Sequence, residues 1–321
     1  MKNFLVTVLA LVSISSCQSG KKEVTGGSNN LRVVGYLLSH DNDWHLGMDT
    51  LGWKGITDLN LAFLNPEADG SFTPNSAYTQ LTTKGHAENV RVFFSIGGGE
   101  PPAYIADLIK ADKRDAFAQA IAQFAVANSF DGVDVDLENA LINEDYAPFV
   151  AAVHRAMKAV NKLTTAALAS WNANQIHDTT LAQFDMIHIM SYDKTGPWNP
   201  ANAGQHSPYS MAVNDFNYFT QTRGQAPSKL TIGLPFYGYG FGPGAPTGLT
   251  FGNIARQFPN SVDDDSVKVA AGGTIYYNGK KTIREKVKFA INSKAAGVMI
   301  WQIAGDARQP NSLLNVINTT N

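Results

Sequence analysis

Three carboxylic acids stand at every second position of one short apolar segment, residues 130–139, with the sequence FDGVDVDLEN. If this segment is a strand, its side chains alternate between two faces, so Asp134, Asp136 and Glu138 share one face and aliphatic residues share the other. Carboxylates roughly 7 Å apart repel one another unless some of them hold a proton. Such a costly arrangement is typical of acid–base catalysis, in which carboxyl groups in different protonation states have different roles.

Two other interpretations of the acidic segment remain open, a solvated strand end and a cation site. A solvated end does not usually alternate so regularly with aliphatic residues, and a cation site usually draws its oxygen ligands from a loop. The acidic run 263–265 lacks the glycine and the distal glutamate of a calcium loop. The 7 histidines show no metal-ligand spacing. We therefore expect no metal ion and no other cofactor.

The acidic segment lies in a series of short β-branched or aliphatic runs that alternate with amphipathic helical patterns. The runs that predict strands are 33–37, 58–64, 90–95, 132–137, 163–169, 186–192, 230–236 and 297–301. The clearest helical patterns cover residues 114–127, 146–161, 208–222 and 282–293. Strands that alternate with helices form parallel sheets, so the chain is predicted to be an α/β protein.

About eight such units, with no break in composition between them, predict a closed (β/α)8 barrel, the TIM barrel. Catalytic residues of this architecture lie at the carboxyl ends of the strands, where the acidic segment ends on Glu138. The predicted domain, residues 31–321, exceeds the roughly 250 residues of a bare barrel. The surplus fits a short insertion between the seventh and eighth strands, at residues 239–277. An open, doubly wound sheet is the structural alternative.

Composition excludes several classes of protein. The chain has 321 residues, of which 44% are hydrophobic, so it can bury a large core and is neither disordered nor fibrous. Charged residues make up 16%, and the formal net charge is −2. Such a chain has no electrostatic basis for binding nucleic acid, which needs a basic face. We expect a neutral partner and a monomeric protein.

The first 17 residues have the pattern of an export signal, with Lys2 at the start, an apolar segment at 4–12 and small residues at 13–16. The sequence of residues 14–17, ISSC, resembles the cleavage box of bacterial lipoproteins, in which the cysteine becomes the lipidated first residue. Cys17 is the only cysteine. Residues 18–30 are polar and rich in glycine and serine, as in a flexible linker. We expect an exported lipoprotein held at the bacterial outer membrane or cell surface by its lipid alone, and an ordinary secretory signal is the alternative.

Several motifs together resemble glycoside hydrolase family 18, the chitinases and related endo-β-N-acetylglucosaminidases. Residues 131–138, DGVDVDLE, match the family signature D-G-x-D-x-D-x-E at every specified position. The other matching segments, in the family's order, are SIGG at 95–98, MSYD at 190–193, GLPFYG at 233–238 and GVMIW at 297–301. The resemblance spans roughly residues 31–310 and implies a TIM barrel.

The resemblance also implies a mechanism in which the acetamido oxygen of the substrate is the nucleophile, an exception to the use of two carboxylates. Glu138 would be the general acid and base. Asp136 would turn between Asp134 and the acetamido N–H, and Asp134 would keep a proton. Tyr192 would donate its hydroxyl to the acetamido carbonyl.

Sugar contacts follow from the same resemblance and from predicted strand ends. Trp301 would form the apolar floor under the reacting sugar, with Met190 and Asp193 beside Tyr192. Further residues at strand ends or in the following loops are candidates to line the cleft or stack on sugar rings: Tyr36, Phe63, Tyr237, Trp44, Trp171 and Trp198. Trp53 is expected to be structural, and His188 is expected to be a buried, hydrogen-bonded core residue.

The implied activity is that of a chitinase that cuts polymers of N-acetylglucosamine internally, with retention of configuration. The predicted insertion is shorter than in many deep-cleft family members, which favours a shallower groove and internal cleavage. An endo-β-N-acetylglucosaminidase acting on the chitobiose core of N-glycans is an alternative with the same chemistry. A lectin with weak or no catalysis is a further alternative, against which the intact Glu138 argues.

The lipoprotein hypothesis predicts that Cys17→Ser abolishes acylation and moves the protein from the membrane fraction to the soluble fraction. The lipid would be the only apolar anchor after signal cleavage. Fractionation and immunoblotting of the two forms measure the shift, with hydrolytic activity as the control that should not change. Equal membrane retention of the serine variant would contradict the hypothesis.

Overall fold

The computed structural model of the protein describes residue 1 and residues 31–39, 44 and 52–321. The predicted signal peptide, its Cys17 and the linker lie outside the described residues, so their assignment stays a prediction. None of the described helices is long and apolar enough to cross a membrane.

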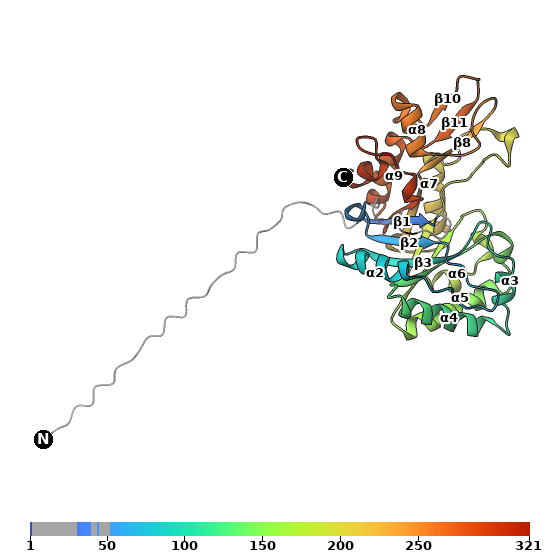
Figure 1. The fold of residues 1–321 in the computed structure, drawn as a ribbon, viewed down its shortest axis with the longest axis vertical. Coiled ribbons are helices and arrows are strands. Elements are labelled where there is room, and N and C mark those ends of the chain that lie inside the picture. The colour runs from blue at the N-terminus through green and yellow to red at the C-terminus, as the bar shows by residue number, and fades with distance from the viewer. Residues whose placement is uncertain (2–30, 40–43, 45–51) are drawn as a thin grey trace.

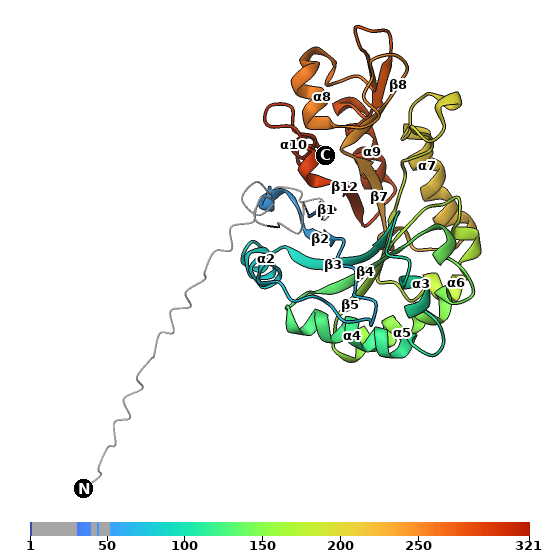
Figure 2. The ribbon, with the colours of Figure 1, turned by 45° about the vertical axis from the view of Figure 1, so that its right-hand side comes forward.

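Eight parallel strands form a closed barrel, as predicted (Figures 1 and 2). In barrel order these are β1 (Arg32–Leu38), β12 (Gly297–Trp301), β7 (Leu230–Pro235), β6 (Met186–Ile189), β5 (Leu163–Leu168), β4 (Gly132–Leu137), β3 (Arg91–Gly98) and β2 (Asp58–Ala62). The barrel closes where β1 pairs in parallel with β12, Arg32 lying opposite Gly297. The observed closure excludes the open, doubly wound sheet.

All eight predicted strands are present, with ends that shift by a few residues. Two ends shift by three residues: β3 extends to Gly98, and β6 ends at Ile189 rather than at Tyr192. The shift in β6 affects the site. The chain turns there, because the Ser191 N–H bonds back to the Ile189 carbonyl and Asp193 adopts a left-handed conformation, φ 60°. This early turn leaves Tyr192 and Asp193 in a loop at the carboxyl end of the barrel, which is the end where active sites of this fold lie.

Helices cover the outside of the barrel, where their apolar faces pack against the strands. They are α2 (Ser76–Ala87), α3 (Ile105–Leu108), α4 (Arg114–Ala127), α5 (Tyr146–Ala159), α6 (Asp178–Leu181), α7 (Tyr209–Asn217), α9 (Lys280–Asn292) and α10 (Leu313–Asn318). The periodicity at 114–127 predicts α4 with its observed ends, and Phe117 of α4 stacks on Phe149 of α5 at 5.5 Å. The predicted helix 208–222 is α7 followed by a π-helical turn, Tyr218–Thr222.

The insertion between the seventh and eighth barrel strands is a small α+β unit. Its antiparallel sheet has the order β10 (Ser266–Lys268), β11 (Thr274–Tyr277), β8 (Tyr237–Phe241) and β9 (Leu249–Thr250), with helix α8 (Phe251–Gln257). In Figures 1 and 2 these orange elements lie at one end of the molecule and the green helices α4 and α5 at the other. The insertion begins at Tyr237, slightly before the predicted start, and one residue, Phe236, separates it from β7.

The pairing of β3 with β4 is unusually close where β3 ends. Gly97 has φ 105°, and a Cβ added there would lie 2.2 Å from the carbonyl oxygen of Asp136. Asn65 holds the same residue, because its side chain accepts from the Gly97 N–H at 2.7 Å and donates to the Gly97 carbonyl at 3.0 Å. A glycine is therefore required at position 97 for β3 to lie this close to the acidic strand.

We predict that Gly97→Ala lowers the free energy of unfolding by roughly 2–5 kcal/mol, the sum of positive-φ strain and overpacking. Gly99→Ala is the matched control, because among the described residues an added Cβ would meet just Oε1 of Glu138, at an ordinary 3.5 Å. The control should change stability by no more than about 0.5 kcal/mol. Urea denaturation of the two variants measures the difference, and equal stability would show that β3 and β4 tolerate a wider separation.

Candidate active site

The three acids lie along β4 and beyond its end as predicted, on the interior side of the barrel. Asp134 is fully buried, Asp136 is 3% exposed and Glu138 is partly exposed just beyond the strand. The alternating residues Val133, Val135 and Leu137 are all 0% exposed and pack in the apolar core. Because β4 pairs with strands on both sides, the carboxyl groups project from a rigid backbone.

Asp134 accepts hydrogen bonds from three hydroxyl groups that come from three different strands. Tyr36 on β1 and Ser95 on β3 donate to Oδ2 at 2.7 and 2.8 Å, and Thr165 on β5 donates to Oδ1 at 2.7 Å. Three donors stabilise a carboxylate. These hydrogen bonds fix the position of the Asp134 side chain, and the expectation that it keeps a proton stays a prediction.

Asp136 has one buried carboxyl oxygen, Oδ1, with no hydrogen-bond partner among the described residues. Burial raises the pKa of Asp136 well above its usual value, and the charges of Glu138 and Asp134 raise it further. The raised pKa favours the protonated form of Asp136, which lessens the repulsion expected of three neighbouring carboxylates. Its free oxygen can accept a hydrogen bond from a ligand.

Glu138 has the protonation behaviour of a general acid at neutral pH. Partial burial raises its pKa from 4.5 to about 7, and the nearby charge of Asp193 adds to the shift. An acid is most effective when its pKa lies near the working pH, because it is then protonated and still able to release its proton. Glu138 is partly exposed, so it can reach a ligand in the mouth of the barrel.

Tyr192 and Asp193 follow β6, which is two strands from β4 in the barrel order. Among the described residues, the Tyr192 hydroxyl donates to the sulfur of Met299, at 3.7 Å, which is a weak acceptor. Burial and the charge of Asp136 raise the pKa of Tyr192 well above its usual value, so its hydroxyl stays a donor. Oδ1 of Asp193 accepts a hydrogen bond from the Tyr237 hydroxyl at 2.5 Å, so Tyr237 contacts a site residue directly.

Trp301 forms an aromatic group with Phe63 and Tyr36 at the ends of β12, β2 and β1. The Trp301 ring lies 5.6 Å from Phe63 and 5.5 Å from Tyr36, measured between ring centroids. Trp301 and Phe63 are partly exposed and can contact a ligand, whereas Tyr36 is 1% exposed. The assignment of Tyr36 to sugar binding is therefore corrected, because its ring supports Trp301 from below and its hydroxyl is used by Asp134. Met190 packs beside this group and is partly exposed.

The remaining tryptophans divide into exposed and buried. Trp171 and Trp198 are 64% and 61% exposed, and Trp198 packs edge-on against Tyr239 at 5.3 Å. Both can offer a ring to a ligand. Trp44 is 2% exposed and packs against Tyr78, so its interpretation as a sugar platform is wrong. Trp53, predicted to be structural, is buried.

Sequence reasoning missed several residues that support the acids. Thr165 was not singled out, although it lies opposite Asp134 in the strand register and shares its inward direction. His206 and Ser207 were also missed, because nothing in their loop marks them as buried, yet both are 0% exposed. His188 is the buried, hydrogen-bonded core residue that was expected, with Nδ1 2.8 Å from the Thr231 hydroxyl.

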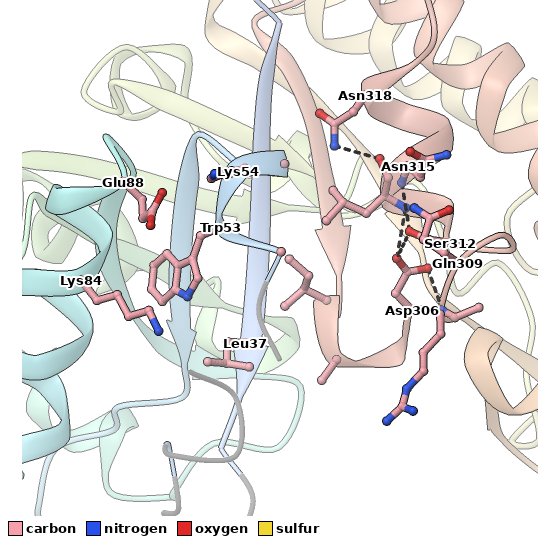
Figure 3. A pocket seen from close by; sticks show the side chains of 17 residues that line it. Leu37, Trp53, Lys54, Lys84, Glu88, Asp306, Gln309, Ser312, Asn315 and Asn318 are labelled. Carbon is pink, nitrogen blue, oxygen red and sulfur yellow. Dashed lines mark hydrogen bonds between the residues drawn. The ribbon is translucent and has the colours of Figure 1, made fainter. Parts of the chain in front are cut away.

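One surface pocket, which none of the three acids lines, is shown in Figure 3. It has a volume of about 930 Å³ and is bounded by Trp53, Lys84 and Glu88 on one side and by residues 303–318 on the other. None of the predicted site residues lines it. Within it the Asp306 side chain accepts hydrogen bonds at the start of α10, which is a structural role. This pocket is therefore not part of the candidate active site.

Comparison with known proteins identifies the family of the chain. The sequence model of Glycosyl hydrolases family 18 matches residues 32–306, which contain the barrel, the three acids and Tyr192. The chain belongs to this family. A crystal structure of the GH18 chitinase ChiB from the chitin utilization locus of Flavobacterium johnsoniae is 34% identical, with a TM-score of 0.82, covering 90% of this chain and 93% of that one. A chitinase from Bacteroides thetaiotaomicron is 29% identical, with a TM-score of 0.79, covering 90% and 95%.

Curated relatives are more distant and longer. Endochitinase 1 of Metarhizium robertsii is 25% identical over 276 residues, which are 70% of this chain and 64% of that protein. A chitinase-like effector of Moniliophthora roreri is 26% identical over 221 residues, 59% of this chain and 54% of that protein. The chain thus matches between about half and two thirds of the length of these two relatives.

We predict that the free energy of unfolding falls as pH rises from 4.5 towards about 7, because the folded protein disfavours the ionised form of Glu138. The ionisation of Glu138 contributes up to about 3 kcal/mol, because each unit of pKa shift corresponds to about 1.4 kcal/mol. Glu138→Gln removes it, so the variant should match the wild type in stability near pH 4 and exceed it at pH 8. Urea denaturation at both pH values measures this. An equal difference in the free energy of unfolding between variant and wild type at both pH values would contradict the raised pKa.

Proposed function

We propose that the protein is a chitinase, which hydrolyses β-1,4-linked polymers of N-acetylglucosamine internally by a substrate-assisted, retaining mechanism. One observation carries the proposal. Glu138, with a pKa of about 7, lies next to Asp136, whose Oδ1 is buried and unpartnered. This pair offers one proton donor at the mouth of the barrel and one polar group for an acetamido substituent beneath it.

The first chemical step breaks the bond between the anomeric carbon and the glycosidic oxygen. Glu138 transfers its proton to the leaving oxygen while the acetamido oxygen of the same sugar forms a bond to the anomeric carbon. The product of this step is a positively charged oxazolinium ring. Water then attacks the anomeric carbon, Glu138 takes up its proton, and the acetamido group leaves, so two inversions give net retention.

Asp136 and Tyr192 supply the groups that this nucleophile needs. Oδ1 of Asp136 has no partner among the described residues and can accept from the acetamido N–H, which orients the acetamido oxygen. The Tyr192 hydroxyl donates to a weak acceptor, the sulfur of Met299, and can turn to the acetamido carbonyl. Charge that develops on the oxazolinium ring is stabilised by the carboxyl groups already in place.

Chitin as the substrate class is supported by the relatives, which are chitinases by name and cover the same barrel. The aromatic floor of Trp301 and Phe63 and the exposed ring of Trp198 give apolar faces of the kind that stack on sugars. An N-glycan core contains the same linkage, and the experiment below includes it as a competing outcome. We further propose that the enzyme is exported and held at the cell surface through Cys17, on the strength of the N-terminal sequence alone.

We predict that the purified protein cleaves a hexamer of N-acetylglucosamine into shorter oligomers and leaves the fully deacetylated hexamer intact. Without the N-acetyl group the reacting sugar has no nucleophile. Glu138→Gln should lose about 10² to 10⁴-fold in kcat, the usual cost of removing acid–base catalysis. Asp136→Asn should also lower kcat, because an amide cannot carry the negative charge that balances the oxazolinium ring. Mass spectrometry of the products measures cleavage.

Three outcomes would contradict parts of the proposal. Comparable cleavage of the deacetylated hexamer, together with a sugar covalently bound to a carboxylate, would show that a protein group is the nucleophile. Release of glycans from a high-mannose glycoprotein without cleavage of the hexamer would identify the N-glycan core as the substrate. Cleavage of neither substrate would favour a binding protein.

A further inference from the structure

His206 is a completely buried histidine in the loop between β6 and α7. Its ring packs against Tyr237 and Tyr239, with centroids 5.0 and 4.9 Å away. Neither ring nitrogen has a hydrogen-bond partner among the described residues. Burying an unpaired polar group costs free energy, so such a group in a native structure calls for an explanation.

The histidine faces one acid of the candidate site. Its Nδ1 lies 3.4 Å from Oδ1 of Asp193, the oxygen that also accepts from Tyr237. The Asp193 side chain is 42% exposed, so without these contacts it could turn out into solvent. The position of this carboxylate matters, because its charge contributes to the raised pKa of Glu138.

The backbone around His206 is fixed from several sides. Its carbonyl accepts from the Lys194 N–H at 2.9 Å, and the next hydroxyl, that of Ser207, donates to the Ser191 carbonyl at 2.6 Å. Lys286 on α9 is fully buried and donates to the Ser207 carbonyl at 2.8 Å and its hydroxyl at 2.7 Å. The ring therefore keeps one orientation, towards Asp193.

We propose that His206 is a positioning residue for the hydrolysis proposed above, because its Nδ1 holds the Asp193 carboxylate beside Glu138. It does not touch the sugar itself, since it is fully buried. The 3.4 Å approach is long for a hydrogen bond, as is common in enzymes without substrate, where such contacts tighten only in the complex. The kinetic test of this inference rests on the proposed function. The NMR test rests on the structure alone.

The titratable groups that face Asp193 are His206, Tyr237, Tyr239, Tyr192 and Glu138. Burial raises the pKa of each of the three tyrosines above its usual value, so they stay neutral near pH 7. Loss of the Nδ1 donor lets Asp193 turn away from Glu138, whose pKa then falls. The limb of the pH profile in which activity is lost at high pH should move to lower pH.

Three variants of His206 distinguish the loss of the Nδ1 donor from the loss of the aromatic ring. His206→Phe keeps the ring between the tyrosines and removes both nitrogens. His206→Asn loses the ring but puts an amide donor where Nδ1 was, and His206→Gln puts its amide nearer the place of Nε2. His86→Phe is the matched control, because it breaks a histidine–aspartate pair of 2.8 Å with Asp131, where β4 begins and far from Glu138.

We expect His206→Phe and His206→Gln to lower kcat about tenfold at pH 7, the scale of one lost hydrogen bond to a charged group. KM for the N-acetylglucosamine hexamer should change little, and the limb should shift to lower pH. His206→Asn should have most of the wild-type kcat and should lose activity at the same high pH as the wild type. His86→Phe should match the wild type in both. Should the phenylalanine variant not fold, the glutamine variant carries the same test.

A titration of Glu138 by ¹³C NMR of glutamate-labelled protein needs no substrate. Glu138→Gln assigns the resonance, and Asp193→Asn sets the full size of the effect. A midpoint lowered in His206→Phe or His206→Gln and restored in His206→Asn supports the proposal. A wild-type midpoint in all three variants overturns it. If the wild-type protein is inactive but the midpoint is lowered in His206→Phe or His206→Gln, the result counts only against the proposed function.

Discussion

Electrostatic repulsion among three carboxyl groups on one buried strand is the constraint on which the site depends. The protein gives each group a different environment. Asp134 receives three hydroxyl donors, Asp136 is buried with its pKa raised well above its usual value, and Glu138 lies at the exposed end with a pKa of about 7. The same differences that make the stack stable give each acid a separate chemical role.

These environments exist only because the sheet closes. Tyr36 belongs to β1, which is three strands away from β4 in the barrel order, yet its hydroxyl lies 2.7 Å from Asp134. In an open sheet with the same order, strands three apart would be separated by roughly 14 Å, beyond the reach of a tyrosine. Barrel closure is thus required for the hydrogen bond between Tyr36 and Asp134 and not only for the core.

Much of the fold and the acids themselves could be predicted from the sequence, because alternation along a strand and helical periodicity are local properties. The eight strands and the inward face of β4 follow from them. Tyr36, Thr165 and His206 could not be assigned in this way, because a single polar residue in an apolar run or loop looks the same whether it serves the core or the site. The prediction that Trp44 stacks on a sugar was wrong for a related reason: its burial depends on Tyr78, which is distant in sequence.

The insertion belongs to the site through its first strand. Tyr237 and Tyr239 alternate with glycines on β8, so both rings lie on the same side of that strand, where they enclose His206 and face Asp193. Only Phe236 separates β8 from β7, so the barrel fixes the position of these rings directly. The remainder of the insertion can vary in length without moving them. The start of β8, in contrast, cannot shift by one residue, because the tyrosines would then point to the opposite face of the small sheet and leave Asp193 without its donors.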